Sequence, residues 1–355
     1  MGGNAFAHLK INRMNMDIYN QIKNDIINKL SKYVIIEIAP ELPDKLDFGD
    51  LDLIYLLKDT KINLVNTIKE IFNPVDIKIN GRTISWVYEL NELYYQIDCN
   101  KCPNETMLEM YKFYFSYSDL GGIIGRIASY YNLKYGFNGL FLHLSEDIVI
   151  NHNNNLKNIT KYNNSYGTVI LNSNPRSICE YMDLDYDKYI SGFNSNIEIY
   201  DWICNSKLFK PDIFVRLNTE HRKRIKVRPF YQKFREYILQ STPVDNAIHS
   251  STRSEINLQL DAIKYFNKID ELNNIIEKIC INQERKDKFN GKVLIDLGIE
   301  QIKITETIIY LKNQILTHNE QQNLSIEQIN NKWINFIDTH TKTEIYEWIK
   351  NKLIT

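Results

Sequence analysis

The sequence predicts an α+β protein, with a mixed sheet and helices in a small N-terminal domain and mostly helical central and C-terminal parts after it. Three observations carry this prediction. Within residues 1–110, segments with apolar residues at helical spacing alternate with short apolar runs. Asn80-Gly81 separates two of these runs, as the central pair of a two-residue β-hairpin turn does. From Glu255 onward, Ile and Leu recur at three- and four-residue spacings, which indicates helices.

The N-terminal elements are expected in the order helix, strand, strand, helix and then a meander of strands. The first helix covers Met16–Leu30, and a second helix over 62–72 ends at Asn73-Pro74, because proline cannot continue a helix. The expected strands are 33–38, 51–57, 75–79, 83–88 and 93–99. Together they make the small α+β domain with a mixed sheet.

The central part is expected to be mainly helical. A helix over 118–131 is capped by Ser118 or Asp119, and 186–208 and 221–239 also have helical spacing. The Asn-rich stretch 151–164 predicts an exposed hairpin loop, and the Ser/Thr-rich stretch 241–254 predicts a linker. We therefore expect three parts: a catalytic domain 1–110, a nucleotide- and acceptor-binding region 111–243, and a helical domain 244–355.

Composition limits the class of protein. The chain has 355 residues with 43% hydrophobic content, which is ample for a core and too apolar for a disordered chain. A net charge of -1 excludes a chain-wide polycation, so any nucleic-acid affinity must come from a local patch. Five cysteines, few and irregularly spaced, argue for a reducing compartment. No apolar run reaches the roughly 20 residues of a membrane span, so we expect a cytoplasmic protein that does not bind membranes.

Three acidic residues are the strongest chemical feature. In Phe48-Gly49-Asp50-Leu51-Asp52-Leu53-Ile54, alternation along a strand puts Asp50 and Asp52 on one face, about 6.6 Å apart. Asp98 stands at the end of another expected strand, on the face away from Ile97. Acids gathered in this way repel one another, so a cation is expected to balance them.

Mg²⁺, or Mn²⁺ in its place, suits such a set of carboxylates. Two acids from one strand and one from its neighbour would make the open site of a two-metal phosphoryl-transfer enzyme. The plainer alternative is that Asp50 and Asp52 end a loop and Asp98 caps a turn. A second Asp-x-Asp, Asp183-Leu184-Asp185, lacks a buried strand and is interpreted as a solvated loop.

Gly49-Asp50-Leu51-Asp52-Leu53, followed by Ile97-Asp98, resembles the active-site motif of the DNA polymerase beta-type nucleotidyltransferase superfamily. The resemblance implies that Asp50, Asp52 and Asp98 are the metal-binding and catalytic residues, with Asp98 placed to help deprotonate the acceptor hydroxyl. Met1-Gly2-Gly3-Asn4-Ala5, together with Lys45 and the motif, is similar to nucleotidyltransferases of tailed phages and giant DNA viruses. A viral origin would place the protein in the host cytoplasm.

The superfamily has Gly-Ser before its first catalytic Asp, where this chain has Ala39-Pro40, and proline offers no amide to a triphosphate. Gly49, an anion-binding nest at Gly2-Gly3-Asn4 and the charge of Lys45 are the candidates to replace it. A second resemblance links 290–299 to the tail of CCA-adding enzymes, a region that grips RNA in those enzymes.

Two further segments are candidates for nucleotide binding. In the Gly-rich helix start, Ser118 and Gly122 would let the sugar or phosphates of a nucleotide approach the helix N-terminus, although glycines also serve close helix packing. Arg126 would then contact phosphate, with a solvated side chain as the alternative. Arg222, Arg224 and Arg228 belong to the densest basic cluster, which aromatic residues follow. That combination suits a triphosphate or single-stranded nucleic acid, and a solvated surface is the alternative.

The sequence therefore predicts a Mg²⁺-dependent nucleotidyltransferase that moves NMP from an NTP, such as ATP, to an acceptor hydroxyl and releases pyrophosphate. The expected acceptor is an RNA or tRNA 3′ end. Transfer to a protein, a small molecule or a second nucleotide, as in oligoadenylate synthesis, stays open. A third hypothesis is an inactive nucleotidyltransferase-like binding or scaffold subunit, which Ala39-Pro40 favours. The cysteines Cys99 and Cys102 have CxxC spacing, but no partners at zinc-ligand spacing follow them.

Overall fold

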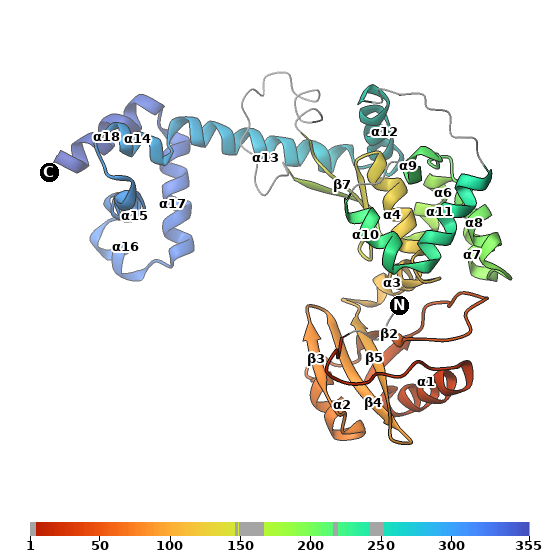
Figure 1. Ribbon diagram of the computed structural model, residues 1–355. Coiled ribbons are helices and arrows are strands. Elements are labelled where there is room, and N and C mark those ends of the chain that lie inside the picture. Colours follow the sequence, from red (N-terminus) through yellow and green to blue (C-terminus); the bar gives the residue numbers. More distant parts are fainter. Residues whose placement is uncertain (1–4, 146–147, 149–166, 216–218, 242–251, 355) are drawn as a thin grey trace. The chain divides into compact units, whose positions relative to one another are not determined.

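The computed structural model describes residues 5–145, 148, 167–215, 219–241 and 252–354 (Figure 1). The α+β prediction is confirmed, because a five-stranded mixed sheet occurs together with many helices. Contacts divide the chain into two compact units. The larger unit is Met1–His143 with Thr168–Lys268, and the smaller is Leu144–Gly167 with Ile269–Thr355. The division into 1–110, 111–243 and 244–355 stays a prediction.

The N-terminal sheet has the strand order β1-β2-β5-β4-β3. Its strands are β1 (Val34–Glu37), β2 (Asp50–Leu57), β3 (Ile77–Asn80), β4 (Thr83–Leu90) and β5 (Leu93–Lys101). Only β2 and β5 pair in parallel, and the other pairs are antiparallel, which makes the sheet mixed as predicted. The hairpin turn between β3 and β4 contains Gly81 at φ +59, a backbone conformation that favours glycine.

One face of this sheet carries the core of the domain. Alternate residues of β2, Leu51, Leu53 and Tyr55, are buried with the helices α1 (Met16–Leu30) and α2 (Leu64–Phe72). Helix α1 has the predicted bounds, and Asn15 caps it by accepting a hydrogen bond from the Ile18 amide. Because strand side chains alternate, the residues between these leucines point to the opposite face of the sheet.

The expected mainly helical central part contains a second sheet, of which the sequence predicted only the hairpin around the Asn-rich stretch 151–164. After η1 (Glu105–Met107), α3 (Leu108–Phe115) and α4 (Leu120–Tyr130), the strands β6 (Leu133–Gly136), β7 (Gly139–His143) and β8 (Thr168–Asn172) form an antiparallel sheet. Strands of four or five residues are too short to show clear alternation. The Asn-rich stretch 151–164 lies outside the described residues.

Two predicted helices are each divided in the structure. The segment 186–208 forms α7 (Tyr186–Ser191) and α8 (Asn196–Cys204), and Gly192 at φ +86 separates them. The segment 221–239 forms α10 (Thr219–Val227) and α11 (Pro229–Ser241), with Pro229 opening the second helix because it has no amide to donate. The other helices of this region are α6 (Pro175–Met182), α9 (Asp212–Val215) and α12 (Thr252–Tyr265). Most of the expected linker 241–254 lies outside the described residues.

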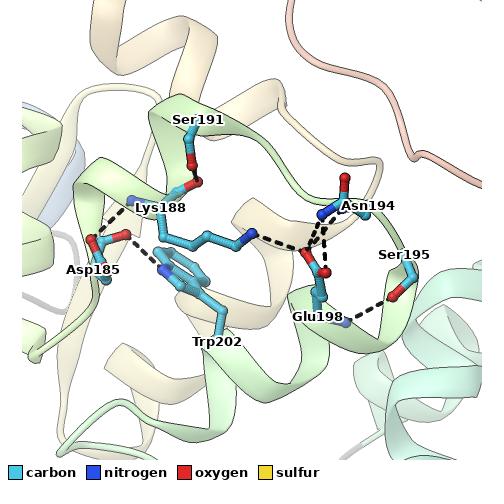
Figure 2. Close-up of polar contacts among 7 residues, drawn as sticks. All are labelled: Asp185, Lys188, Ser191, Asn194, Ser195, Glu198 and Trp202. Atoms are coloured by element: carbon cyan, nitrogen blue, oxygen red, sulfur yellow. Dashed lines mark hydrogen bonds and ion pairs between the residues drawn. The ribbon is translucent and has the colours of Figure 1, made fainter.

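A polar network holds the corner between α7 and α8 (Figure 2). Glu198 accepts hydrogen bonds from the Asn194 amide and side chain and from Lys188 Nζ, and these contacts lower its pKa to about 2. The Ser195 hydroxyl caps α8, and the Asp185 carbonyl accepts the Trp202 indole N–H. The second Asp-x-Asp therefore serves helix ends: Asp183 follows α6 at φ +61, and the Asp185 side chain caps α7.

From Ile269 onward the smaller unit is helical, as predicted for the chain from 255 onward. It contains α13 (Ile269–Lys288), α14 (Gly291–Asp296), η2 (Gln301–Lys303), α15 (Ile304–Gln314), α16 (His318–Asn323), α17 (Ile326–Thr339) and α18 (Lys342–Ile354). Its core gathers Leu311, Trp333, Ile337, Ile345 and Ile349. None of the helices in the described part of the chain has the length and apolar content needed to span a bilayer.

Candidate active site

The three acidic residues lie on neighbouring strands. In the parallel register of β2 and β5, Asp52 stands opposite Asp98, and Asp50 stands opposite Gln96. All three acids point away from the face that carries Leu51, Ile97 and the core. The expected placement, two acids on one strand and one on its neighbour, is what the structure has.

Two amide side chains donate hydrogen bonds to these carboxylates. Gln96 Nε2 donates to both oxygens of Asp98, at 3.0 and 2.9 Å, and Asn100 Nδ2 donates to Asp52 Oδ1 at 3.3 Å. Desolvation, followed by the charges of Asp50 and Asp98, raises the pKa of Asp52 well above its usual range. Desolvation also raises the pKa of Asp98, although hydrogen bonds from Ser85 and Gln96 oppose the shift.

The donor chemistry of this cluster suits a hard cation. Carboxylate oxygens are the ligands that Mg²⁺ and Mn²⁺ prefer, and a positive ion would offset the repulsion that raises the pKa of Asp52. Asp50, Asp52 and Asp98 are therefore the residues that could hold a metal. As the side chains stand, within the described residues no three His, Cys, Asp or Glu side chains are placed to share one ion.

The acids open onto a cavity of about 360 Å³. Its lining residues come from the sheet, Arg13, the segment before β2, the end of α3, the start of α4, the last turn of α10 and the residue after it. They are Arg13, Ala39, Glu41, Lys45, Gly49, Asp50, Asp52, Asp98, Tyr114, Phe115, Ser118, Asp119, Gly122, Arg224 and Arg228. The cavity thus has a carboxylate wall on the sheet and basic side chains from other segments.

Glycines at the start of α4 let two groups come close to the helix. A β-carbon on Gly121 would stand 2.3 Å from the Tyr114 carbonyl oxygen, and one on Gly122 would stand 2.1 Å from Arg224 Nη1. The preceding residues Tyr117 and Ser118 have φ of 49° and 60°, the left-handed region that non-glycine residues rarely adopt. Backbone of this kind is costly and is often found at functional sites.

Arg224 lies over the first turn of α4 beside Asp119. Arg224 Nη1 is 3.7 Å from Asp119 Oδ1, and Asp119 Oδ2 is buried with no hydrogen-bond partner among the described residues. Burial raises the pKa of Asp119, while the charges of Arg224 and Arg228 act in the opposite direction. Asp119 was expected to cap α4, but its side chain makes no capping hydrogen bond. Asp119 forms an ion pair with Arg224 instead.

The segment 39–47 closes another side of the cavity and is tied down at several points. The Pro40 carbonyl accepts the Tyr117 amide at 2.7 Å, and Asp44 Oδ2 accepts the Asn196 amide at 3.1 Å. Lys45 pairs with Glu41 at 2.6 Å and lies over the ring of Phe48. Asp47 pairs with Arg13. Pro40 therefore holds the corner before α4 with its carbonyl.

The structure brings together most, but not all, of the residues singled out in the sequence. Of the candidates for metal, catalysis and nucleotide binding, all line the cavity except Arg126 and Arg222. The Arg126 guanidinium donates to the Ile213 carbonyl, and Arg222 is exposed and is not among the lining residues. The Gly2-Gly3-Asn4 segment lies outside the described residues. Cys99 and Cys102 are free thiols buried in separate clusters, so the CxxC spacing does not bring them together.

Sequence reasoning missed several lining residues. Arg13 and Glu41 belong to no recognisable motif, and nothing near them in the sequence indicates a site. Tyr114 and Phe115 end the helix α3, which was not predicted. For Asp119 the sequence predicts only a possible role as helix cap. Its position beside Gly121-Gly122 was the available signal, because an acid at a glycine-rich helix start can meet a basic side chain that packs there.

Comparison with known proteins adds no relative. No protein-family model matches the chain, and no curated protein matches it either.

Proposed function

We propose that this chain is a Mg²⁺-dependent nucleotidyltransferase, which transfers NMP from an NTP to an acceptor hydroxyl and releases pyrophosphate. One observation carries the proposal. Residues chosen from four segments of the sequence for metal, phosphate and nucleotide binding line a single cavity of about 360 Å³. That volume lies within the range of small-ligand sites.

The carboxylate wall would hold the metal. Asp50, Asp52 and Asp98 supply oxygen ligands, and the bound metal would supply charge neutralisation and activation of the attacking hydroxyl. Gln96 and Asn100 fix the orientation of Asp98 and Asp52 by hydrogen bonds. Asp98 accepts the proton of the acceptor hydroxyl in this proposal, which its raised pKa favours.

The basic side chains would hold the triphosphate. Arg224 and Arg228 line the cavity with the first turn of α4, where the helix N-terminus favours negative charge. Asp119 keeps Arg224 over Gly122 until phosphate competes for the guanidinium. These groups take the place of the Gly-Ser amides that Ala39-Pro40 cannot supply.

An RNA 3′ end is the proposed acceptor, on the resemblance of 290–299 to the tail of CCA-adding enzymes. Transfer to a protein, a small molecule or a second nucleotide would use the same carboxylates and the same arginines. The acceptor is therefore decided by the products of the assay described below.

One observation favours the second candidate, an inactive subunit with a nucleotidyltransferase-like site. The amides of Gln96 and Asn100 occupy carboxylate oxygens, and within the described part of the chain no three acidic side chains stand as one metal site. Against it, an idle cavity has no physical reason to keep a buried acid beside like charges, where desolvation and then the charges of Asp50 and Asp98 raise the pKa of Asp52.

The test is incubation of the purified protein with Mg²⁺ or Mn²⁺, each labelled NTP in turn and a pool of small RNAs. We expect label in RNA with the wild type and none with Asp50→Asn/Asp52→Asn. Asp183→Asn/Asp185→Asn is the matched control, because it removes the same charge at the same spacing. Asn suits both the left-handed residue 183 and the helix cap 185, so the control should fold and stay active.

The products distinguish the candidates. Label on the protein or in a small soluble product would move the acceptor away from RNA while keeping the enzyme. Absence of label from every product, with each NTP and both metals, would overturn the proposal and leave the inactive subunit.

A further inference from the structure

A second and larger hollow lies on the other face of the N-terminal sheet. It has a volume of about 860 Å³ and is lined by the end of β2, the start of α2, the β3–β4 turn and the end of β5. Leu57 and Ile84 belong to the sheet face that packs against α1 and α2, and Leu64 is the first residue of α2, whereas Asp50 and Asp52 point to the opposite face. This hollow is therefore separate from the acidic cavity.

Its rim is basic. Lys61 follows β2, Arg82 lies in the β3–β4 turn and Lys101 ends β5. The cations come from three segments, and two of them are neighbours, since the Lys101 amide donates to the Arg82 carbonyl at 2.9 Å. All three are exposed. Among the described residues that line the hollow, none is acidic. A chain whose net charge is -1 has no general excess of cations, so this concentration is local.

Its floor is apolar. Leu57, Ile62, Val65 and Ile84 line it with Ile79, which is 65% exposed although it belongs to a strand. Arg82 is partly fixed, since its Nη1 donates to the Tyr111 hydroxyl at 2.9 Å. Several cations beside an apolar floor match a ligand with repeated negative charges and flat apolar faces between them.

We propose that this hollow binds single-stranded nucleic acid, with phosphates on Lys61, Arg82 and Lys101 and bases against the apolar floor. Single strands are bound by basic grooves that follow the backbone and by surfaces that accept the faces of bases. The volume is at the upper end of the range for small-ligand sites, and the open rim suits a segment of chain. The inference does not depend on nucleotidyl transfer.

The test is fluorescence anisotropy of a labelled 12-nucleotide oligo(U), without NTP or divalent metal, across a series of KCl concentrations. Three phosphate contacts to a single strand contribute a slope of about -2 to log K against log[salt], or roughly 20-fold between 50 and 200 mM. Lys61→Gln/Arg82→Gln/Lys101→Gln should lose that contribution. Lys10→Gln/Lys32→Gln/Lys69→Gln is the matched control, since it removes equal charge from exposed lysines outside the hollow.

A second variant guards against a folding effect, because Arg82 contacts Tyr111. Lys61→Gln/Lys101→Gln keeps that contact and should lose about two thirds of the slope change. An unchanged salt slope in both variants of the hollow, or an equal change of slope in the control variant, would overturn the proposal. So would competition by poly-glutamate or by a duplex of the same length as strong as that of unlabelled oligo(U).

Discussion

The guanidinium of Arg224 occupies the space above Gly122 where any other residue would carry its β-carbon. The distance from that β-carbon position to Arg224 Nη1 is 2.1 Å, and to Asp119 Oδ1 it is 2.8 Å. Both contacts are with the ends of side chains that can move. A residue larger than glycine would therefore displace the arginine and leave the helix intact.

Gly122→Ala should separate stability from nucleotide binding. Removing a glycine from a helix gains about 0.5–1 kcal/mol, so the free energy of unfolding should stay equal or rise. The Michaelis constant for NTP should rise about tenfold, since one charged contact is displaced from the cavity. Urea unfolding and initial rates of NMP transfer measure the two effects. A lower stability with an unchanged Michaelis constant would contradict the role given to Arg224.

Gly121→Ala, one residue earlier, should behave in the opposite way. Its β-carbon would stand 2.3 Å from the backbone oxygen of Tyr114, which cannot turn aside. Overpacking of this kind costs about 1–3 kcal/mol. We expect a clear loss in the free energy of unfolding, measured by urea, and a variant as stable as the wild type would show that α3 and α4 can shift apart.

Substitutions of arginines in the basic cluster should differ according to position. Arg224→Gln and Arg228→Gln each remove a charged contact from the cavity, so the Michaelis constant for NTP should rise roughly ten- to hundredfold. Arg222→Gln removes the same charge from an exposed position outside the cavity and should change it less than about twofold. Steady-state kinetics at fixed ionic strength measure all three. Equal effects would mean that the cluster acts only through its overall charge.

The N-terminal sheet was predictable because its signals are local. Helix α1, the strand that carries Asp50 and Asp52 and the Asn80-Gly81 turn are each specified by spacing or by turn chemistry within a few residues. Gly192 and Pro229 are residues at which a helix often ends, but the helical spacing of apolar residues continues on both sides of each and favoured one long helix. The strands β6–β8 are four or five residues long, too short for a clear alternation, although β6 and β7 follow each other directly and β8 pairs with β7 across residues 144–167.

The candidate site was predictable to the extent that its chemistry has a pattern. Asp50, Asp52 and Asp98 follow strand alternation, and the register of β2 with β5 then brings them together. Arg224 and Arg222 look equivalent in sequence, and the turn of α10 decides which of them meets α4. Arg13 and Glu41 reach the cavity only through tertiary contacts, which a single sequence does not reveal.

The raised pKa of Asp52 makes a prediction about pH. A folded-state pKa above the unfolded value means that the folded protein holds the proton more tightly. Stability from this group is therefore greatest at low pH and falls as pH rises from about 4 through the folded-state pKa. Asp98 and Asp119 act in the same direction. In EDTA, thermal unfolding at pH 8 should occur at a lower temperature than at pH 5.5.

Asp52→Asn tests whether this cost is linked to metal binding. In EDTA at pH 8 the variant should unfold at a higher temperature than the wild type, because the repelling charge is gone. Mg²⁺ at a hundredfold excess over its dissociation constant should stabilise the wild type by about 2.7 kcal/mol and the variant far less. A wild type indifferent to Mg²⁺ and Mn²⁺ would argue for the inactive subunit.

The contact between Asp44 and Asn196 ties the segment 39–47 to the first turn of α8. Asp44 Oδ2 accepts the Asn196 amide at 3.1 Å, an acid at a helix N-terminus. Asp44→Ala should lower the free energy of unfolding by about 1 kcal/mol. It should also slow NMP transfer, since the same segment brings Glu41 and Lys45 to the cavity.

Ser195→Ala is the control for that variant, because Ser195 caps the same helix from inside the corner shown in Figure 2 and does not contact the segment 39–47. Loss of its cap should cost a similar amount, about 1 kcal/mol. Urea unfolding should therefore give similar values for the two variants, while only Asp44→Ala is slow in transfer. Equal rates would show that Asp44 stabilises α8 without positioning the segment, and the side chains of Glu41 and Lys45 would then be held by their own ion pair and by Phe48.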